Sequence, residues 1–306
     1  MLKGKNFLTM QECTSNELKI ILDEASSLKK GKLKKDNILS QKVLAMIFQK
    51  PSTRTRISFE VAMRQLGGHA LYLSWGELQL GRGETIADTA RVLSRYVHGI
   101  MARVLFHSEI EEMAKYATVP VINGLSDLHH PCQALADILT IREKKGKLNG
   151  LKLAWIGDGN NVCNSLLIAC SIFGVNITAA CPQGYEPDIA ILNWAKQKAS
   201  KTGSLIEIVR EPEKAAKKAD IIYTDTFISM GKEAERKKRL KIFIPKYQVT
   251  SKLFKYANSD AVFMHCLPAH RGEEVLDDVI DGPHSIVWDQ AENRLHIQKA
   301  LLAELL

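Results

Sequence analysis

The chain has 306 residues, 45% of them hydrophobic and 25% charged, which is ordinary for a soluble globular protein and long enough for two domains. No apolar run approaches the roughly 20 residues that a membrane span requires, and the N-terminal residues lack the apolar core of a signal peptide. We therefore expect a cytoplasmic protein with no membrane partner.

The net charge of +8 admits nucleic acid or a small anionic substrate as a partner. The lysine runs are dispersed, and no aromatic residues interleave with them as an RNA-binding surface requires. We interpret these runs, at 29–35, 144–147, 217–220 and 235–241, as solvated faces, and we expect no nucleic-acid partner. The six cysteines form no CxxC pair, which favours reduced thiols over a disulfide framework.

A helix is predicted at 14–30, where Thr14 and Glu17 stand at capping-box spacing. After it, short strands rich in Val and Ile alternate with amphipathic helices, as in buried parallel sheets. Strands are predicted at 43–48, 70–74, 119–124, 151–157, 175–181, 204–210, 221–227 and 261–267. Helices are predicted at 57–68, 84–97, 132–146, 162–174, 188–203, 212–219 and 290–306.

This alternation predicts an α/β protein with two doubly wound parallel-sheet domains. We place the domains at 1–141 and 150–289, because the basic, glycine-bearing segment between them has the composition of a linker. Periodicity does not decide which domain the last helix, 290–306, packs against.

Unusual polar clusters follow the predicted strands in both halves of the chain. In open parallel sheets, ligands bind beyond the carboxyl ends of the strands. The clusters are PSTRTR at 51–56, GELQLGRGE at 76–84, HHPCQ at 129–133, GDGNN at 157–161, DTFISMG at 225–231 and HCLPAHRGEE at 265–274. Six such clusters on two sheets predict a single active-site cleft facing both domains.

The stretch PSTRTR joins a predicted strand to a predicted helix. Ser52 or Thr53 can cap this helix, and hydroxyls, free N–H groups and guanidinium forks together form a phosphate cradle. A capped helix with two exposed arginines explains the same residues. If Arg56 forms a structural ion pair, Arg54 is the better anion ligand.

Two other chemistries are disfavoured. GDGNN is not a dinucleotide fingerprint, because Val162 stands where the third glycine belongs and no acidic residue ends the next strand. Among the histidines, no pair fits a zinc motif, and Pro268 interrupts any helical face between His265 and His270. We expect no metal and no cofactor, and a Cys–His nucleophilic pair has no support beyond the residue types.

Taken together, four motifs resemble those of the aspartate/ornithine carbamoyltransferase family. STRTR at 52–56 is similar to the family's carbamoyl-phosphate motif, and HPCQ at 130–133 resembles its HPxQ motif. DTFISMG at 225–231 resembles the DxxxSMG loop of the ornithine branch, and HCLPAHRGEEV at 265–275 resembles its HCLP signature. Aspartate transcarbamylases typically carry HPLPR there and lack SMG. The resemblance runs in order along the whole chain.

The resemblance implies transfer of the carbamoyl group of carbamoyl phosphate to the δ-amine of L-ornithine, giving L-citrulline and phosphate within arginine metabolism. The implied carbamoyl-phosphate ligands are Ser52, Thr53, Arg54, Thr55, Gln79, Arg103, His130, Gln133, Cys266, Leu267 and Arg294. The catalytic residues implied among them are Thr55, Arg103, His130 and Cys266. The implied ornithine ligands are Asn161, Asp225, Ser229 and Met230, with Asn160 as the alternative to Asn161.

The resemblance also implies a homotrimer in which Gln79 reaches the site of a neighbouring subunit, and a last helix that packs back onto the first domain. Because the amine attacks directly, Cys266 is not required as a covalent nucleophile. A transcarbamylase for putrescine or N-acetylornithine is the alternative activity, which the SMG and HCLP motifs disfavour. The motifs do not distinguish arginine synthesis from arginine breakdown.

Overall fold

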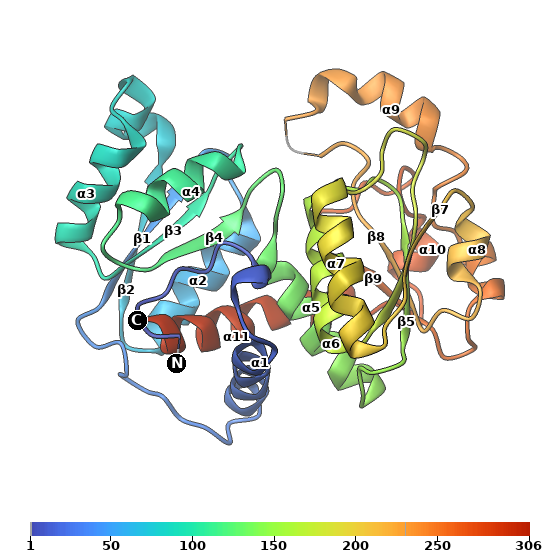
Figure 1. Cartoon of the computed structure of the whole chain (residues 1–306), viewed down its shortest axis with the longest axis horizontal. Coiled ribbons are helices and arrows are strands. Elements are labelled where there is room, and N and C mark those ends of the chain that lie inside the picture. Colours follow the sequence, from blue (N-terminus) through green and yellow to red (C-terminus); the bar gives the residue numbers. More distant parts are fainter. Residues whose placement is uncertain (1, 230) are drawn as a thin grey trace. The chain divides into compact units, whose positions relative to one another are not determined.

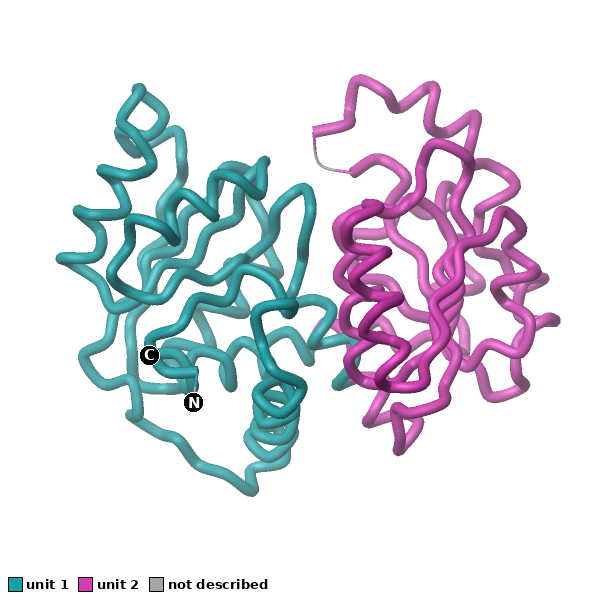
Figure 2. The backbone as a smooth tube through the Cα atoms, in the orientation of Figure 1, with its two compact units in different colours: residues 1–139, 292–306 teal, residues 140–291 magenta. Residues whose placement is uncertain are grey.

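The computed structural model of the chain describes residues 2–229 and 231–306. The chain divides into two compact units, which Figure 2 colours separately. Unit 1 comprises residues 1–139 and 292–306, and unit 2 comprises residues 140–291. The last fifteen residues of the chain therefore belong to the first unit.

Unit 1 contains one parallel sheet with helices on both faces (Figure 1). Its strands are β1 (Val43–Phe48), β2 (His69–Ser74), β3 (Gly99–Arg103) and β4 (Val121–Leu125). They lie in the order β2-β1-β3-β4. The helices α3 (Ile86–Tyr96) and α4 (His107–Tyr116) cover one face, and α1 (Ser15–Lys29), α2 (Thr53–Gln65) and α11 (Val287–Leu305) lie on the other. The helix α5 (Pro131–Lys145) follows β4.

Unit 2 contains a second sheet of five parallel strands. These are β5 (Lys152–Ile156), β6 (Asn176–Ala180), β7 (Ile206–Val209), β8 (Ile221–Thr224) and β9 (Val262–His265), in the order β7-β6-β5-β8-β9. The helices α6 (Asn161–Phe173) and α7 (Ile189–Thr202) cover one face, and α8 (Pro212–Ala216) and α10 (Asp277–Ile280) cover the other (Figure 1). The helix α9 (Arg236–Phe243) follows β8.

The central strands are buried on both faces, which explains their continuous apolar sequence. Polar caps fix the starts of several helices. Thr14 and Glu17 form a reciprocal capping box at α1, as the spacing predicted. At α6, the Asn160 side chain accepts hydrogen bonds from the N–H groups of Val162 and Cys163.

The predicted fold class, α/β with two parallel sheets, is confirmed. The sequence patterns did not predict β3 or α4. β3 has only five residues, GIMAR, which begin with a glycine and end with an arginine, and no turn residue separates it from the preceding helix. In the sheet, β3 lies between β1 and β4, and this position buries it despite its weak local pattern.

All six cysteines are free thiols, and Cys132, Cys163, Cys170 and Cys181 are buried. Among the described residues, no helix combines the length and the apolar character needed to cross a membrane.

Candidate active site

In each unit, at least one polar cluster follows a strand next to the point where the strand order reverses. In unit 1 this point lies between β1 and β3, and in unit 2 it lies between β5 and β8. Loops that leave such a point diverge to opposite faces and open a crevice at the carboxyl edge of the sheet. The motifs STRTR and GDGNN follow β1 and β5, so both stand at this position.

The stretch PSTRTR begins α2. The Ser52 hydroxyl caps the helix by accepting a hydrogen bond from the Thr55 N–H at 3.3 Å. The N–H group of Thr53 lies in the same first turn, where a helix has no internal acceptor for it. A helix N-terminus with free N–H groups favours an anion.

The two arginines of this stretch differ in their surroundings. Arg56 is exposed, its Nε lies 3.7 Å from the Glu60 carboxylate, and its guanidinium stacks 4.0 Å from the centre of the Tyr72 ring. Arg54 is half-buried. Arg56 therefore has the structural ion pair that the sequence suggested, which favours Arg54 as the anion ligand.

Arg294 joins three of the predicted ligands of unit 1. Its Nη1 donates to Gln133 Oε1 at 2.6 Å and lies 3.4 Å from His130 Nε2, and its Nη2 donates to Thr55 Oγ1 at 3.2 Å. The Arg294 side chain comes from α11, whereas Thr55 begins α2 and the other two lie at the start of α5. All four residues are buried.

His130 is held neutral by its surroundings. Burial lowers the pKa of its imidazole well below the usual value, and the positive charges of Arg294, Arg103 and Arg54 lower it further. Because a guanidinium only donates, His130 Nε2 accepts from Arg294, which leaves the ring proton on Nδ1. Arg54 and Arg103 thus lie close enough to His130 to act on its charge.

Gln133 has its amide orientation fixed by a residue that the sequence analysis missed. Its Nε2 donates to Asp137 Oδ1 at 2.8 Å, so its Oε1 is the atom that faces Arg294. Asp137 is fully buried on α5. The sequence could have indicated Asp137, because it lies four residues after Gln133 on a predicted helix and residues at this spacing share a face.

Two other predicted residues of unit 1 lie at or beyond the carboxyl ends of strands. Arg103 ends β3 and is half-buried, with its carbonyl oxygen accepting from the Gln49 N–H at 2.9 Å. Gln79 is exposed in the segment between β2 and α3, where it begins a short 3₁₀ turn, Gln79–Arg82.

In unit 2, Asp225 is the centre of the predicted ornithine cluster. It directly follows β8 and is 6% exposed. Its Oδ2 accepts from Asn160 Nδ2 at 2.7 Å, and its Oδ1 accepts from the Cys266 thiol at 3.0 Å. Loops after β5, β8 and β9 thus meet at one carboxylate, which is suited to bind an ammonium group.

The remaining predicted residues surround this carboxylate in different ways. Asn161 begins α6, whereas Asn160 both caps that helix and orients Asp225. The Ser229 hydroxyl donates to Asp158 Oδ2 at 3.4 Å. Leu267 has a left-handed backbone conformation with φ of 59°, which is uncommon for a side chain of this type and occurs at functional sites. Met230 lies outside the described residues.

Two groups of three potential metal ligands occur in unit 2, although none was expected. They are Asp225 with His265 and Cys266, and His270 with Glu273 and Glu274, and the ligand atoms of each group lie within 4.8 Å of one another. In the first group the thiol of Cys266 donates to Asp225, and in the second the His270 N–H donates to Glu274. Hydrogen bonds thus join two of the three members of each group.

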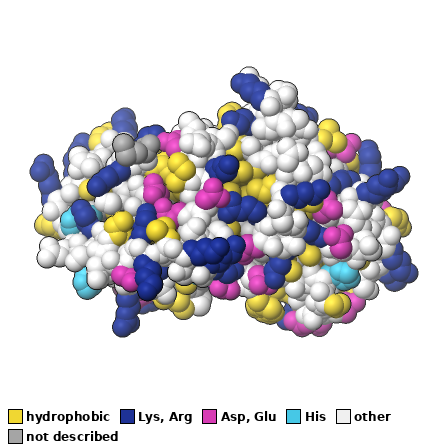
Figure 3. All heavy atoms as spheres, turned by 90° about the horizontal axis from the view of Figure 1, so that it is seen from below, with side chains coloured by type: hydrophobic (Ala, Val, Ile, Leu, Met, Phe, Trp, Pro, Cys, Tyr) yellow, Lys and Arg dark blue, Asp and Glu magenta, His cyan; other side chains and the backbone are white. Residues whose placement is uncertain are grey.

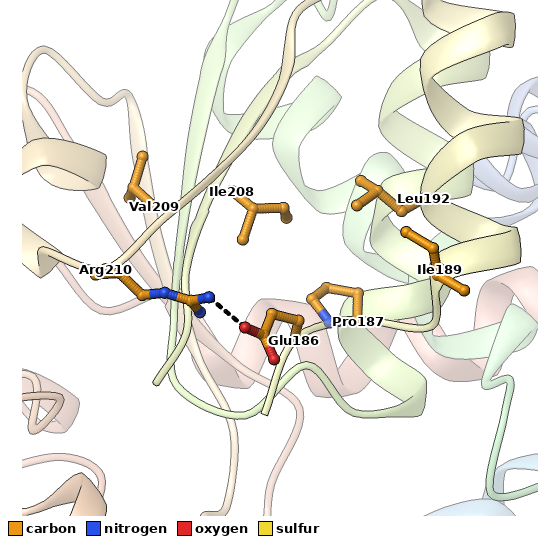
Figure 4. A pocket seen from close by; sticks show the side chains of 7 residues that line it. All are labelled: Glu186, Pro187, Ile189, Leu192, Ile208, Val209 and Arg210. Atoms are coloured by element: carbon orange, nitrogen blue, oxygen red, sulfur yellow. Dashed lines mark hydrogen bonds and ion pairs between the residues drawn. The ribbon is translucent and has the colours of Figure 1, made fainter. Parts of the chain in front are cut away.

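A pocket at the carboxyl end of β7 contains none of the predicted residues (Figure 4). Ile189 and Leu192 of α7 face Ile208 of β7 across it, and Arg210 forms an ion pair with Glu186 at its edge. Its lining is mostly apolar, so it does not resemble a site for a phosphate or an amino acid.

The interpretation of the basic runs needs one correction. On the face seen in Figure 3, lysine and arginine side chains are scattered among acidic ones, as solvated faces are. However, Arg239 in the run 235–241 is only 4% exposed, and the Lys145 side chain is 8% exposed and pairs with Asp260 at 2.9 Å. Composition alone does not reveal which residue of a basic run turns inward to a carboxylate.

The fold and the two clusters are those of an α/β enzyme with two substrates, with a cation-rich cluster in one unit and a carboxylate cluster in the other. Residues 5–143 match the family model "Aspartate/ornithine carbamoyltransferase, carbamoyl-P binding domain", and residues 149–305 match "Aspartate/ornithine carbamoyltransferase, Asp/Orn binding domain". The chain belongs to the aspartate/ornithine carbamoyltransferase family, so the resemblance of the motifs is confirmed.

Individual relatives match along the whole chain. It is 60% identical over 307 residues to the ornithine carbamoyltransferase of Pyrococcus horikoshii, covering 100% of this chain and 96% of that protein. It is also 60% identical over 304 residues to a Pyrococcus furiosus protein named "Ornithine carbamoyltransferase, anabolic", covering 99% and 96%. The solved structure of the Pyrococcus furiosus ornithine carbamoyltransferase is similar with a TM-score of 0.95 at 59% identity, covering 99% of this chain and 97% of that one.

Proposed function

We propose that the protein transfers the carbamoyl group of carbamoyl phosphate to the δ-amine of L-ornithine, giving L-citrulline and phosphate. The relatives named above support this activity, because they match nearly the whole chain at 60% identity. The name of the Pyrococcus furiosus relative includes "anabolic", which favours a role in arginine biosynthesis. We further propose that residues 1–141 with the last helix bind carbamoyl phosphate, that residues 150–289 bind ornithine, and that the enzyme is cytoplasmic.

The observation that carries this proposal is the set of contacts around Arg294 in unit 1. Its guanidinium holds Thr55, His130 and Gln133 together and adds positive charge beside them. In the proposed complex, the dianionic phosphate lies at the N-terminus of α2. It takes hydrogen bonds from Ser52, Thr53, Arg54 and Thr55, and Gln79 of a neighbouring subunit completes the site.

The carbamoyl group is oriented by the other members of the group. Thr55, Arg103 and neutral His130 donate to the carbonyl oxygen, and Gln133 accepts from the carbamoyl NH₂. As the amine attacks, negative charge develops on this oxygen, and each fixed donor lowers the barrier by about 3 kcal/mol. A neutral imidazole serves here as a fixed donor, because its Nδ1 carries the proton.

In the acceptor site, Asp225 pairs with the ammonium group, and Asn161, Ser229 and Met230 hold the amino-acid head. Cys266 and the carbonyl oxygen of Leu267 lie against the δ-amine. The pKa of this amine in water is about 10.4, as for lysine, so it must lose a proton before or during attack. The C–N bond forms, the C–O bond to phosphate breaks, and phosphate leaves.

We propose a homotrimer, in which Gln79 enters the site of a neighbouring subunit. The exposed position of Gln79 beyond β2 supports this assembly. Large apolar side chains are also exposed on α2, on the edge strand β2 and on α3, at Ile57, Leu71, Val92 and Tyr96. Exposed apolar side chains of this size are typical of protein interfaces.

A citrulline assay tests the proposed activity. With carbamoyl phosphate present, we expect citrulline from ornithine and no carbamoylated product from aspartate, putrescine or N-acetylornithine. Product from aspartate alone, or from putrescine alone, would overturn the substrate assignment. Light scattering of the same preparation measures the mass, which should be three times 34.2 kDa.

A further inference from the structure

A buried ion pair lies beside the proposed ornithine site, and none of the family motifs discussed above explains it. Asp158 follows β5, and Arg239 comes from α9, far along the chain. The guanidinium of Arg239 contacts the Asp158 carboxylate, and the two side chains are only 5% and 13% exposed, respectively. Both residues belong to unit 2.

Arg239 is fixed from several sides. Its Nε donates to the carbonyl oxygen of Phe227 at 2.6 Å, and its Nη1 donates to Glu235 at 3.3 Å. Its guanidinium also lies 4.8 Å from the centre of the Tyr185 ring. A planar guanidinium with hydrogen bonds and an aromatic neighbour has one defined position, so it can in turn hold other groups.

Through these contacts the pair holds the loop 225–229 at two points. Arg239 binds the backbone at Phe227, and Asp158 Oδ2 accepts both from Arg239 and from the Ser229 hydroxyl. The Phe227 ring stacks on Phe243 of α9 at 4.7 Å between centroids. The loop that begins with Asp225 and carries Ser229 is thus fastened to α9 and β5.

Charge makes the pair interdependent. Burial raises the pKa of Asp158, Arg239 opposes this, Asp225 nearby adds to it, and the net result is a pKa of about 6. Removing either partner leaves a buried charge without its counterion, which is more disruptive than removing both. Without Arg239, the charges of Asp158 and Asp225 repel each other, which displaces the loop that carries Asp225.

We propose that Asp158 and Arg239 are positioning residues that set the loop 225–229 for ornithine and so determine the affinity for the amine substrate. This inference rests on the proposed function. The pair touches neither substrate in this account. Its effect is expected on the ornithine side of the reaction only, because its contacts lie within unit 2, with the ornithine loop, α9 and Tyr185 in the segment after β6.

The test compares Arg239→Gln, Arg239→Lys and Asp158→Asn with Arg236→Gln. Arg236 lies on the same helix but is exposed and pairs with Glu273. We expect KM for ornithine to rise at least tenfold in Arg239→Gln and Asp158→Asn, with KM for carbamoyl phosphate within twofold. Arg236→Gln should change neither KM more than twofold. The KM for ornithine of Arg239→Lys should lie between those of wild type and Arg239→Gln.

A double variant separates positioning from loss of fold. Asp158→Asn with Arg239→Gln removes both charges, so its KM for ornithine should be closer to wild type than that of Arg239→Gln alone. Melting curves identify any variant that fails to fold. If Arg239→Gln fails to fold, the KM for ornithine of Arg239→Lys is compared with that of wild type instead. Equal increases in both KM values, or an unchanged KM for ornithine in folded variants, would refute the positioning role. A wild-type enzyme without citrulline activity would refute the proposed function instead.

Discussion

The polar cluster of unit 1 and that of unit 2 handle charge in opposite ways. Around His130, three arginines lie near a neutral ring, whose pKa is lowered first by burial and then by their positive charges. Around Asp225, by contrast, the carboxylate accepts from neutral Asn160 and Cys266. The first cluster therefore concentrates positive charge, which suits an anion, whereas neutral donors leave the negative charge of the second cluster available for an ammonium group.

The largest effect is expected at the cation-rich cluster. Arg54→Ala should lower kcat/KM about a hundredfold or more, because a donor at the developing or bound anion is lost. Arg56→Ala should change it less than about fivefold, because an exposed ion pair and stack contribute about 1 kcal/mol or less. Steady-state kinetics of the two variants, with melting temperatures as the fold control, measure the difference.

A near-wild-type rate for Arg54→Ala would return residues 51–56 to the simpler interpretation of a capped helix with surface arginines. The same rate loss in both variants would show that the two guanidinium groups act together.

The second effect is expected at the carboxylate cluster. Asp225→Asn keeps the shape and the hydrogen bond to Asn160 but removes the charge, so KM for ornithine should rise about 10- to 100-fold. KM for carbamoyl phosphate should stay within twofold. Asp278→Asn, at an exposed position of α10, is the matched control. If carbamoyl-phosphate affinity fell as much as ornithine affinity, the division of labour between the two clusters would be wrong.

The smallest effect is a difference in how stability depends on pH. His130 has a pKa well below its usual value in the folded state, so below about pH 6.5 the unfolded chain binds a proton there that the folded chain does not. Its contribution therefore destabilises the fold as the pH falls through 6.5. Asp158 behaves oppositely, because its raised pKa of about 6 makes the folded state bind the extra proton, which stabilises the fold as the pH falls from 6 toward 4.

Urea unfolding of wild type, His130→Asn and Asp158→Asn between pH 4 and 8 measures how the free energy of unfolding changes with pH in each protein. Relative to wild type, His130→Asn should lose less stability on acidification and Asp158→Asn should lose more. Parallel pH curves for all three proteins would contradict the two shifts.

The sequence was informative where a function occupies contiguous residues. STRTR, HPCQ and HCLP each follow a buried strand, so the strand pattern and the motif indicated the same edge of the sheet. The strand β3 was missed because its burial is decided by its two neighbours in the sheet and not by its own five residues. The cap at Ser52 and the capping box at Thr14 were predictable because caps depend on local sequence alone.

The rest of the candidate site depends on contacts between distant segments. Asp158 stands within GDGNN, but its partner Arg239 lies 81 residues later in a run that looks solvated. Nothing in the spacing of that run indicates which basic side chain turns inward. Arg294 is separated from Thr55 by 239 residues, and only the family resemblance included it among the expected carbamoyl-phosphate ligands.

The position of Arg294 in the chain affects the order in which unit 1 folds during synthesis. Unit 1 is interrupted by the whole of unit 2, and the residues from 292 onward return to it. Domains generally fold as units while the ribosome is still adding residues. Here the sheet of unit 1 can form early. The contacts of Thr55, His130 and Gln133 with Arg294 can form only later, because Arg294 is synthesised after unit 2. Synthesis that stops short of Arg294 therefore leaves a chain that has both sheets but lacks the guanidinium that joins Thr55, His130 and Gln133.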